Sequence, residues 1–338
     1  MNKRIIFLSS LMLCFVLISS SANARVKPDW TESEPVRYPN NLYISATGSA
    51  SDIELAKDRA LANLSKIFEA HINEVSTTKS DTYVSLNNMQ EMVAKNNHLS
   101  QLVRVTTNKI IRGAQIVESW RDEELAVFYA LAVLDRKQAR NNIMDEINRL
   151  DEETITKLEK VKLSTNTLRK IAALDKAISL QEDRLSLHKM LKIINLHGRG
   201  YSSEWQLADL QNQLESEFNL LKISAAVDAR STTPELDKIL KSSMANSGFP
   251  AVDNGDYTLL INLTVNDLGY QQGWYWRRAK LNIELVKSSG QIIEQKEWLL
   301  KVSALQQADA ESRLMTRVSN KLNADLRSLI IGAASIVY

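Results

Sequence analysis

Apolar and polar positions along the first third of the chain predict a strand, a helix and then two more strands. The stretch LYISATG at 42–48 is extended and apolar, and apolar residues at three- and four-residue spacing follow it, as on one face of a helix. Two β-rich stretches at 104–122 and 125–135 meet at the charged residues RDEE, which predict a hairpin turn. The polar stretch at about 76–97 is less regular, and we interpret it as a loop with a second helix. The helical face contains Ile53, Ala56, Ala60, Leu64 and Ile67.

The middle of the chain, residues 138–219, contains no proline and shows no strand pattern. Strict heptads do not persist along it, so the pattern does not predict a long coiled coil. The residues HGRGY at 197–201 interrupt the helical pattern, and we expect a further helix at about 203–218. This composition predicts an extended helical hairpin or arm. Its apolar stripe contains Ile171, Leu174, Ile178 and Leu185.

The last segment, residues 220–338, predicts the order β-α-β-β-β-α. A strand at 220–228 precedes a helix within 231–249, which has a proline near its start and a glycine after its end. Leu281, Ile283 and Leu285 alternate with polar residues, as in a strand with one buried face. Three strands are expected at 257–267, 275–290 and 292–305, and a final helix is expected from near Ala308 with Leu314, Val318, Leu322, Leu326 and Leu329 on one face.

The predicted fold class is therefore α+β, with two small mixed domains whose sheets are rich in antiparallel strands, joined by a helical arm. The predicted domain limits are 25–137 for the first domain, 138–219 for the arm and 220–338 for the second domain.

Residues 1–24 have the layout of a secretory signal peptide. Lys3 and Arg4 precede an apolar stretch, and SSSANA ends at Ala24 with the small residues of a cleavage site. Cys14 lies within the apolar stretch and is the single cysteine of the chain. The residues LML before Cys14 are not the small residues of a lipoprotein signal, so we do not expect a lipid anchor. We predict a periplasmic protein without disulfides.

Charge and hydropathy restrict the classes of partner. Without residues 1–24 the chain has 40 basic and 40 acidic side chains. Nucleic-acid-binding proteins usually carry a basic surplus, because neutralisation of phosphates dominates their affinity, so we do not expect a nucleic-acid partner. No later hydrophobic segment reaches the roughly 20 residues that a transmembrane helix needs, so we expect no membrane span after signal cleavage.

The transition after the first strand has the strand–glycine–helix layout of a phosphate-binding loop. However, it has one glycine, Gly48, and lacks the lysine of a P-loop and the three glycines of a dinucleotide loop. We interpret Ser51 and Glu54 as a helix-capping box, and Gly48 as relief for a tight backbone between strand and helix. The negative charge of Asp52 and Glu54 would repel a phosphate, so the pattern favours a structural turn.

The sequence shows no motif for catalysis or metal binding. The histidines have no zinc-site spacing, and there is no G-x-S-x-G motif for a serine hydrolase. The acidic runs 122–124 and 151–153 are typical of solvated turns or helix starts. We expect no catalytic, cofactor-binding or metal-binding residues. An enzyme whose site residues are scattered in the sequence is the alternative that this pattern leaves open. The histidines are His71, His98, His188 and His197.

The most unusual local composition is the stretch GYQQGWYWRRAKL at 269–281. On a strand, Trp274 and Trp276 share one face and Tyr275 and Arg277 the other. Our default interpretation is that both tryptophans cover the core of the second domain, with Arg278 at the surface. The alternative is an exposed aromatic–arginine patch, the composition of interface hot spots, which binds a protein or a glycan strand.

Four short stretches in the first third of the chain resemble the Lpp-twenty family of envelope lipoproteins. They are PDW at 28–30, YPNNLYISATGSAS at 38–51, AKDRALANLSKI at 56–67, and the stretch from IRGAQ to DRKQA at 111–139. The resemblance implies a small α+β envelope domain with no catalytic residues to transfer. Family members are often lipid-anchored, and some relatives assist a sheathed or ring-bearing flagellum. The last third is similar, more weakly, to the amino-terminal domain of Tol-B and to penicillin-binding-protein activators, which are periplasmic interaction domains.

These observations together favour a non-catalytic periplasmic protein of the cell envelope that acts as a scaffold or partner-binding adaptor. The alternative from the resemblance is an accessory protein of flagellar ring or sheath assembly. The expected partners are envelope proteins, with peptidoglycan as a further candidate, and self-association is compatible with the sequence. The candidate partner-binding residues are Trp274, Tyr275, Trp276, Arg277 and Arg278.

Overall fold

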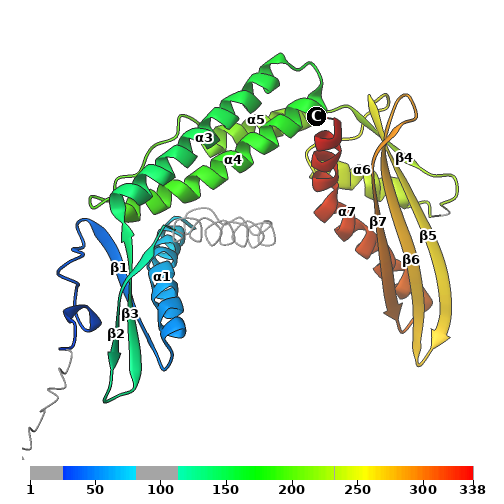
Figure 1. Ribbon diagram of the computed structural model, residues 1–338. Helices are drawn as coiled ribbons and strands as arrows, with labels where there is room; N and C mark the ends of the chain where they lie inside the picture. The colour runs from blue at the N-terminus through cyan, green and yellow to red at the C-terminus, as the bar shows by residue number, and fades with distance from the viewer. Residues whose placement is uncertain (1–25, 81–112, 232, 338) are drawn as a thin grey trace, which may run out of the picture.

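The computed structural model describes residues 26–80, 113–231 and 233–337, and these form two sheet-containing domains joined by a helical arm (Figure 1). The predicted α+β class is confirmed. The predicted signal peptide with Cys14, most of the polar stretch at 76–97 and the beginning of the first hairpin strand lie outside the described residues.

The N-terminal domain is a three-stranded antiparallel sheet in the order β1-β3-β2. One face of the sheet packs on α1, and the segment before β1 covers the other face through Trp30, which is 3% exposed. The predicted order of strand, helix and hairpin is confirmed. The elements are η1 (Asp29–Thr31), β1 (Tyr43–Ala50), α1 (Ile53–Ser80), β2 (Gln115–Asp122) and β3 (Val127–Asp135).

Gly48 does not lie in a turn, so that part of the prediction is wrong. It lies within β1, opposite Ala130 of β3, and β1 continues to Ala50. A Cβ atom at Gly48 would lie 2.7 Å from the carbonyl carbon of Arg59 and closer still to backbone atoms of Ala56 and Ala60. The glycine is therefore needed because the backbone of α1 approaches the sheet closely, as in other tight helix–sheet contacts.

The predicted capping box at the start of α1 is also wrong. The helix begins at Ile53, so the residue before it is Asp52 and not Ser51. The Oδ1 atom of Asp52 accepts hydrogen bonds from the amides of Glu54 (2.9 Å) and Leu55 (3.1 Å). Glu54 forms an ion pair with Lys57 at 2.7 Å and does not reach back to a cap residue. The helix start is thus satisfied by its own aspartate, which supports a structural role for this junction.

The arm consists of the antiparallel helices α3 (Arg136–Leu163) and α4 (Thr167–Ile194), followed by α5 (Leu207–Asn219). Asp135 and Asn166 cap the first two helices by accepting hydrogen bonds from the amides of Gln138 (2.9 Å) and Arg169 (3.0 Å). The predicted helical hairpin is confirmed.

Two details of the arm differ from the prediction. Leu185 is 38% exposed, whereas Ile171, Leu174 and Ile178 are buried. The buried face shifts because the first half of α4 packs on the C-terminal core and its second half on the N-terminal core. In addition, α5 begins at Leu207 rather than near 203, because an extended segment precedes it.

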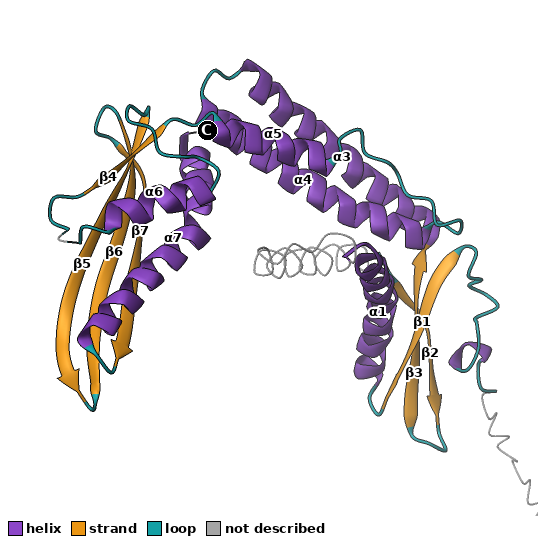
Figure 2. Cartoon of the chain, turned by 180° about the vertical axis from the view of Figure 1, so that it is seen from behind, coloured by secondary structure: helices purple, strands orange, loops and turns teal. Residues whose placement is uncertain are grey.

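The C-terminal domain is a four-stranded sheet in the order β4-β5-β6-β7, parallel between β4 and β5 and antiparallel elsewhere. The helices α6 and α7 pack on one face of the sheet (Figure 2), and the predicted apolar stripe of α7 is buried there. The predicted element order is confirmed. The elements are β4 (Ile223–Val227), α6 (Leu236–Asn246), β5 (Tyr257–Gln271), β6 (Trp274–Lys287), β7 (Ile292–Ala304) and α7 (Gln307–Val337).

Arg136 joins the N-terminal domain to the arm. Its Nε donates to the backbone oxygens of Asn40 (2.7 Å) and Tyr43 (3.3 Å) before and within β1. Its Nη1 donates to the backbone oxygens of Ile193 (3.0 Å) and Ile194 (2.8 Å) at the end of α4. Burial at this position lowers the pKa of the guanidinium from its ordinary value. One side chain thus forms hydrogen bonds to both parts, in addition to the hydrophobic core that they share.

Arg327 of α7 has a similar position at the other end of the arm. Its Nη1 donates to Glu215 of α5 at 3.0 Å, and its guanidinium lies 4.1 Å from the ring centre of Phe218. Phe218 in turn stacks on Phe249, with ring centres 6.0 Å apart, within one hydrophobic core that α4, α5 and the C-terminal sheet share. This shared core fixes the C-terminal domain against the arm.

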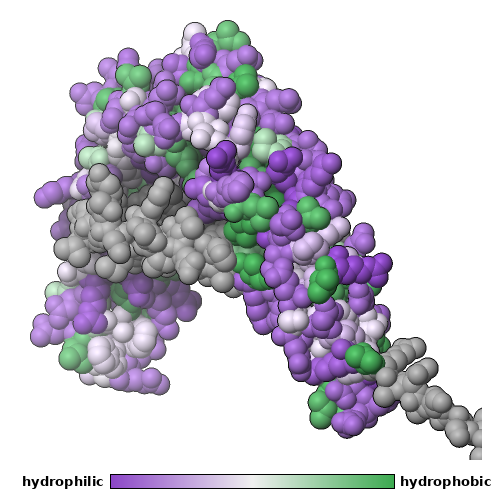
Figure 3. Space-filling model, turned by 90° about the vertical axis from the view of Figure 1, so that its left-hand side faces the viewer, coloured by the Kyte–Doolittle hydropathy of each residue, from purple (hydrophilic) through white to green (hydrophobic). Residues whose placement is uncertain are grey.

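The two domains and the arm form an arch (Figures 1 and 2). The arm is the top of the arch, α1, α6 and α7 lie on its inner sides, and the two sheets lie on its outer sides. Hydrophilic residues dominate the surface drawn in Figure 3, and hydrophobic residues occur there in small separate groups. Within the described residues, no helix has both the length and the apolar character needed to cross a bilayer.

Candidate interaction surface

The candidate residues 274–278 lie at one end of the C-terminal sheet, directly after the turn between β5 and β6. Both turn residues, Gln272 and Gly273, have positive φ values of 51° and 85°. Two-residue hairpin loops favour this backbone because its twist matches that of the flanking strands. The sheet therefore ends in a tight hairpin tip, where the first residue of β6 is Trp274.

Trp274, Trp276 and Arg278 lie on the sheet face that neither α6 nor α7 covers. The buried residues of β6 begin at Ala279, and they alternate with this face along the strand. Trp274 is 39% exposed, and Trp276 is half-buried. Our default interpretation, that both tryptophans cover the core, is therefore wrong, because side chains alternate along β6 and its helix-covered face holds the odd-numbered residues.

Tyr275 and Arg277 lie on the opposite face, as strand alternation predicts. Arg277 lies between Asp267 of β5 and Glu311 of α7, at 3.8 and 3.5 Å, and its side chain is 14% exposed. The Tyr275 ring packs against Tyr270, with ring centres 4.9 Å apart. The structure therefore separates the five candidates: Arg277 and Tyr275 hold the hairpin tip, and the two tryptophans and Arg278 face outward.

Strand pairing adds residues from β7 that the sequence analysis did not include. Lys301 lies opposite Arg278, and its Nζ is 4.4 Å from the ring centre of Trp276. Leu299 lies opposite Lys280 and is 76% exposed. The alternation EWLLKVS indicated a strand, but only the register with β6 shows that Leu299 rather than Leu300 faces outward.

This surface combines aromatic rings with cations, the composition that dominates binding energy at protein interfaces. A lysine above a tryptophan ring is held by the ring's negative face, which is a favourable cation–π contact. Lys280 forms an ion pair with Glu297 at 2.7 Å, so it is already neutralised, whereas Arg278 faces Lys301 across the strands. Such a surface suits a partner with carboxylates or with rings that stack on tryptophan.

Two of the groups considered for chemistry have structural contacts. The Nδ1 atom of His188 contacts the backbone oxygen of Tyr201 at 2.8 Å. Asp122 accepts hydrogen bonds from the amides of Glu124 and Leu125, each at 3.0 Å, which fits the predicted turn. Within the described residues, no cluster of three or more histidine, cysteine or carboxylate side chains could hold a metal ion. His71 and His98 lie outside the residues whose side chains are described.

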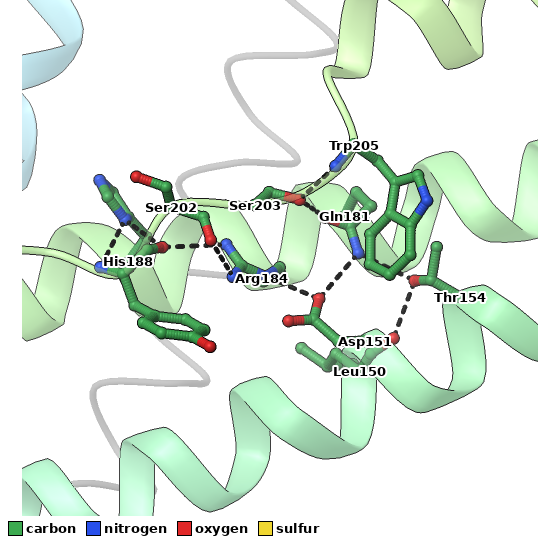
Figure 4. Close-up of polar contacts among 10 residues, drawn as sticks. Leu150, Asp151, Thr154, Gln181, Arg184, His188, Ser202, Ser203 and Trp205 are labelled. Atoms are coloured by element: carbon green, nitrogen blue, oxygen red, sulfur yellow. Dashed lines mark hydrogen bonds and ion pairs between the residues drawn. The ribbon is translucent and has the colours of Figure 1, made fainter.

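The acidic run 151–153 lies in the middle of α3, so its predicted place at a turn or helix start is wrong. Asp151 faces α4, where its Oδ1 accepts a hydrogen bond from Arg184 Nε at 2.7 Å and one from Gln181 Nε2 at 3.2 Å (Figure 4). Arg184 and Gln181 are each 3% exposed. A buried ion pair with these additional hydrogen bonds replaces the expected solvated carboxylate.

The same polar group binds the extended segment between α4 and α5. Arg184 donates to the backbone oxygens of Tyr201 (3.1 Å) and Ser202 (2.9 Å), and Ser203 donates to Gln181 Oε1 at 2.7 Å (Figure 4). We call residues 195–206 the strap. Its backbone oxygens complete the hydrogen bonding of Arg184, so the network positions the strap against the helical hairpin.

Comparison with known proteins identifies the first domain. Residues 28–135 match the family model of the LPP20 lipoprotein, which confirms the resemblance. A secreted protein of Helicobacter pylori has a solved structure that is 14% identical, with a TM-score of 0.43 over 86% of this chain and 98% of its own. A minor lipoprotein of Acinetobacter baumannii is 18% identical, with a TM-score of 0.23 over 34% of this chain and 86% of its own. No curated protein sequence is significantly similar.

The family match fits an extracytoplasmic protein of the cell envelope. It covers the first domain, and the similarity of the last third to Tol-B stays a prediction.

Proposed function

We propose that this chain, with its LPP20 lipoprotein domain, is a non-catalytic adaptor of the cell envelope that binds partners through the two domains of its arch. Its C-terminal partner binds the surface of Trp274, Trp276, Arg278 and Lys301. The chain works in the periplasm after signal cleavage and without a lipid anchor. The partners are envelope proteins that present carboxylates or aromatic rings, with peptidoglycan as the candidate glycan.

The observation that carries this proposal is the outer face of the C-terminal sheet, which neither α6 nor α7 covers. A tryptophan that is 39% exposed at a hairpin tip, beside a second tryptophan under a lysine, leaves apolar area in water that a partner would bury. The arch supports the proposal, since Arg136 and Arg327 fix each domain against the arm and the sheets lie on its outer sides.

A non-catalytic role is supported by the structural hydrogen bonds and ion pairs that the buried polar side chains form. The buried network around Arg184 is satisfied by the strap, and the ion pairs of Arg277 connect β5 to α7. Each of these groups stabilises a junction between elements. A periplasmic adaptor needs such junctions, because its partners bind at sites that the fold must hold apart.

The test replaces both tryptophans in the full chain, as Trp274→Ala with Trp276→Ala. Because both side chains lie on the open face, we expect the melting temperature to stay close to that of the parent. We expect the variant to lose the partners that the parent retains from an envelope extract, identified by mass spectrometry, and to lose any co-sedimentation with purified peptidoglycan.

A matched control is Trp298→Ala, which removes a tryptophan on the helix-covered face. Trp298 is 9% exposed, and its Nε1 donates to Asp325 at 2.9 Å, so this change should cost about 3–5 kcal/mol of stability. If the double variant melts as low as Trp298→Ala, or if it retains every partner of the parent, the proposed surface is wrong. Partners that belong to the flagellar ring or sheath would assign the adaptor to flagellar assembly.

A further inference from the structure

The edge strand β7 differs from the other sheet edges of the molecule. On β1, Arg59 and Asn63 of α1 donate to the backbone oxygens of Ser49 (2.7 Å) and Thr47 (3.0 Å). On β4, which has five residues, the amide of Val252 donates to the backbone oxygen of Ile223 at 3.0 Å. A bulge interrupts β2. Proteins use such features to prevent edge strands from pairing with other chains.

The edge of β7 carries this protection only near its ends, and a bulge at Ile293 lies close to its start. It has 13 residues, and among the described residues its backbone pairs with β6 alone. Arg313 of α7 donates to the backbone oxygen of Ser303 at 2.7 Å, which protects one end of the strand. The amide of Gln295 donates to the side chain of Glu294 at 3.1 Å, and the central part from Lys296 to Lys301 has no comparable cover within the described chain. A long edge strand with free backbone groups is a template for a further strand.

The side chains on the open face of β7 are symmetric about Leu299. They read Gln295, Glu297, Leu299, Lys301 and Ser303. If a second β7 runs antiparallel with Leu299 opposite Leu299, then Glu297 of each strand faces Lys301 of the other. The polar Gln295 and Ser303 face each other in the same way. The strand therefore complements itself in charge and in apolar character, and it does so in one register.

We propose that β7 pairs with β7 of a second copy of this chain, antiparallel and across a two-fold axis at Leu299, so that the two C-terminal sheets become continuous. The pairing places Glu297, which also forms an ion pair with Lys280 of β6 at 2.7 Å, opposite Lys301 of the other copy, twice by symmetry. It also buries both Leu299 side chains, each 76% exposed in the single chain. Opposite-charge pairs directly across antiparallel strands are favourable, and like charges there are unfavourable. The helices α7 of both copies then lie on the same side of the joined sheet.

A second copy is the occupant that the charges favour. A strand of another protein would complement β7 if it had an acidic residue opposite Lys301 and a basic residue opposite Glu297. A second copy supplies both at once, at the spacing of two residues on either side of an exposed leucine. The tryptophans at the hairpin tip remain outside this pairing, because β6 separates them from the edge of the sheet.

Cysteine cross-linking tests the register directly. In a full chain with Cys14→Ser, the variant Leu299→Cys places two thiols at the axis, where directly opposite residues lie within disulfide reach. We expect covalent dimers of Leu299→Cys under mild oxidation. Glu297→Cys alone should not cross-link, because the two copies of this position lie roughly 13 Å apart in this register. Mixing Glu297→Cys with Lys301→Cys should restore cross-linking.

Charge reversal tests the partner. Sedimentation of the unmodified chain should show a dimer that dissociates on dilution, and Lys301→Glu should weaken association by about tenfold, because two attractive pairs become repulsive. Combining Lys301→Glu with Glu297→Lys should recover part of the association, because Glu297→Lys restores the opposite charges across the axis but also removes the ion pair with Lys280. Lys241→Glu on α6, an equally exposed charge away from β7, is the matched control and should leave association unchanged.

Three outcomes would overturn the proposal. The first is a chain that stays monomeric at every concentration and does not cross-link at Leu299. The second is a dimer that neither Lys301→Glu nor Leu299→Lys weakens. The third is equal cross-linking of Leu299→Cys and of Tyr270→Cys, since Tyr270 is a 62% exposed residue at the hairpin tip and reports random collision. Thermal melts of the dilute variants separate lost association from lost folding.

Discussion

At the scale of single residues, the molecule depends on side chains whose neighbours come from distant parts of the chain. Arg136 contacts backbone oxygens near residue 40 and near residue 194, and Arg327 contacts α5 across more than a hundred residues. Sequence patterns give no sign of these roles, because each arginine also fits an exposed helix position. Gly48 is similar: the sequence predicted the helix that follows it, but not how closely the backbone of that helix packs on the strand at Gly48.

Gly48→Ala tests the close contact between β1 and α1. The added methyl group overlaps backbone atoms of α1, which cannot move as a flexible side chain can, so we expect a loss of about 3 kcal/mol in the free energy of unfolding. Chemical denaturation measures it. Ser49→Ala, on the other face of the same strand, is the control and should stay within about 0.5 kcal/mol. Equal stability of both variants would show that the helix does not approach β1 this closely.

Asp175 of α4 predicts a pH dependence of stability. Burial raises the pKa of its carboxyl above the ordinary value of 3.8, against the opposing effect of the charges on Lys176 and Arg327. The folded state therefore binds this proton more tightly than the unfolded state, and the contribution is fully present below pH 3.8 and lost as the pH rises through the raised pKa.

Asp175→Asn removes the loss of stability that ionisation of the buried carboxyl causes. We expect the variant to be more stable than the parent at pH 7, and the difference to shrink towards pH 4. Denaturant titrations at the two pH values measure this. Asp145→Asn, an exposed position on α3, should show no such trend. A variant that is less stable than the parent at pH 7 would mean that the ionised carboxylate has a partner.

At the scale of elements, apolar periodicity was enough to predict most strands and helices and the faces they bury. The alternation in β6 placed Leu281, Ile283 and Leu285 inside, and they are buried. The same alternation puts the even-numbered Trp274 and Trp276 on the opposite face from Leu281, and our default interpretation did not extend it to these two residues. The sequence predicted a break in the helix at 197–201 but not the length of the strap, whose extended backbone is bound by buried polar groups of α4.

Arg184→Leu tests how the strap is held. The change leaves Asp151 without its cation and the backbone oxygens of Tyr201 and Ser202 without their donor, and breaking a buried ion pair from one side costs about 3–5 kcal/mol. We expect the free energy of unfolding to fall by an amount near the lower end of this range, as measured by thermal or chemical unfolding. We also expect faster amide exchange in the strap. Arg149→Ala removes an exposed arginine with two acidic neighbours on α3 and should cost under about 1 kcal/mol. Equal losses for the two variants would contradict the role given to Arg184.

At the scale of the whole molecule, the account depends on an arch that keeps its shape. The arm shares one hydrophobic core with the C-terminal domain and another with the N-terminal domain. Each domain is therefore packed against the arm as well as covalently connected to it. The sequence predicted two domains and an arm between them. It could not predict that the arm would take part in both cores, because the buried face of α4 changes along the helix.

The most direct test of the account is the distance between the two domains in solution. Spin labels on Asp58→Cys of α1 and Lys238→Cys of α6, in a chain with Cys14→Ser, report it by pulsed electron resonance, and dilution with unlabelled chain removes contacts between copies. The account predicts one narrow distance distribution, which Arg136→Lys broadens because a lysine cannot donate to all four backbone oxygens at once. A broad distribution in the parent chain would contradict the arch, and with it the proposal that this protein holds its partners at a fixed separation.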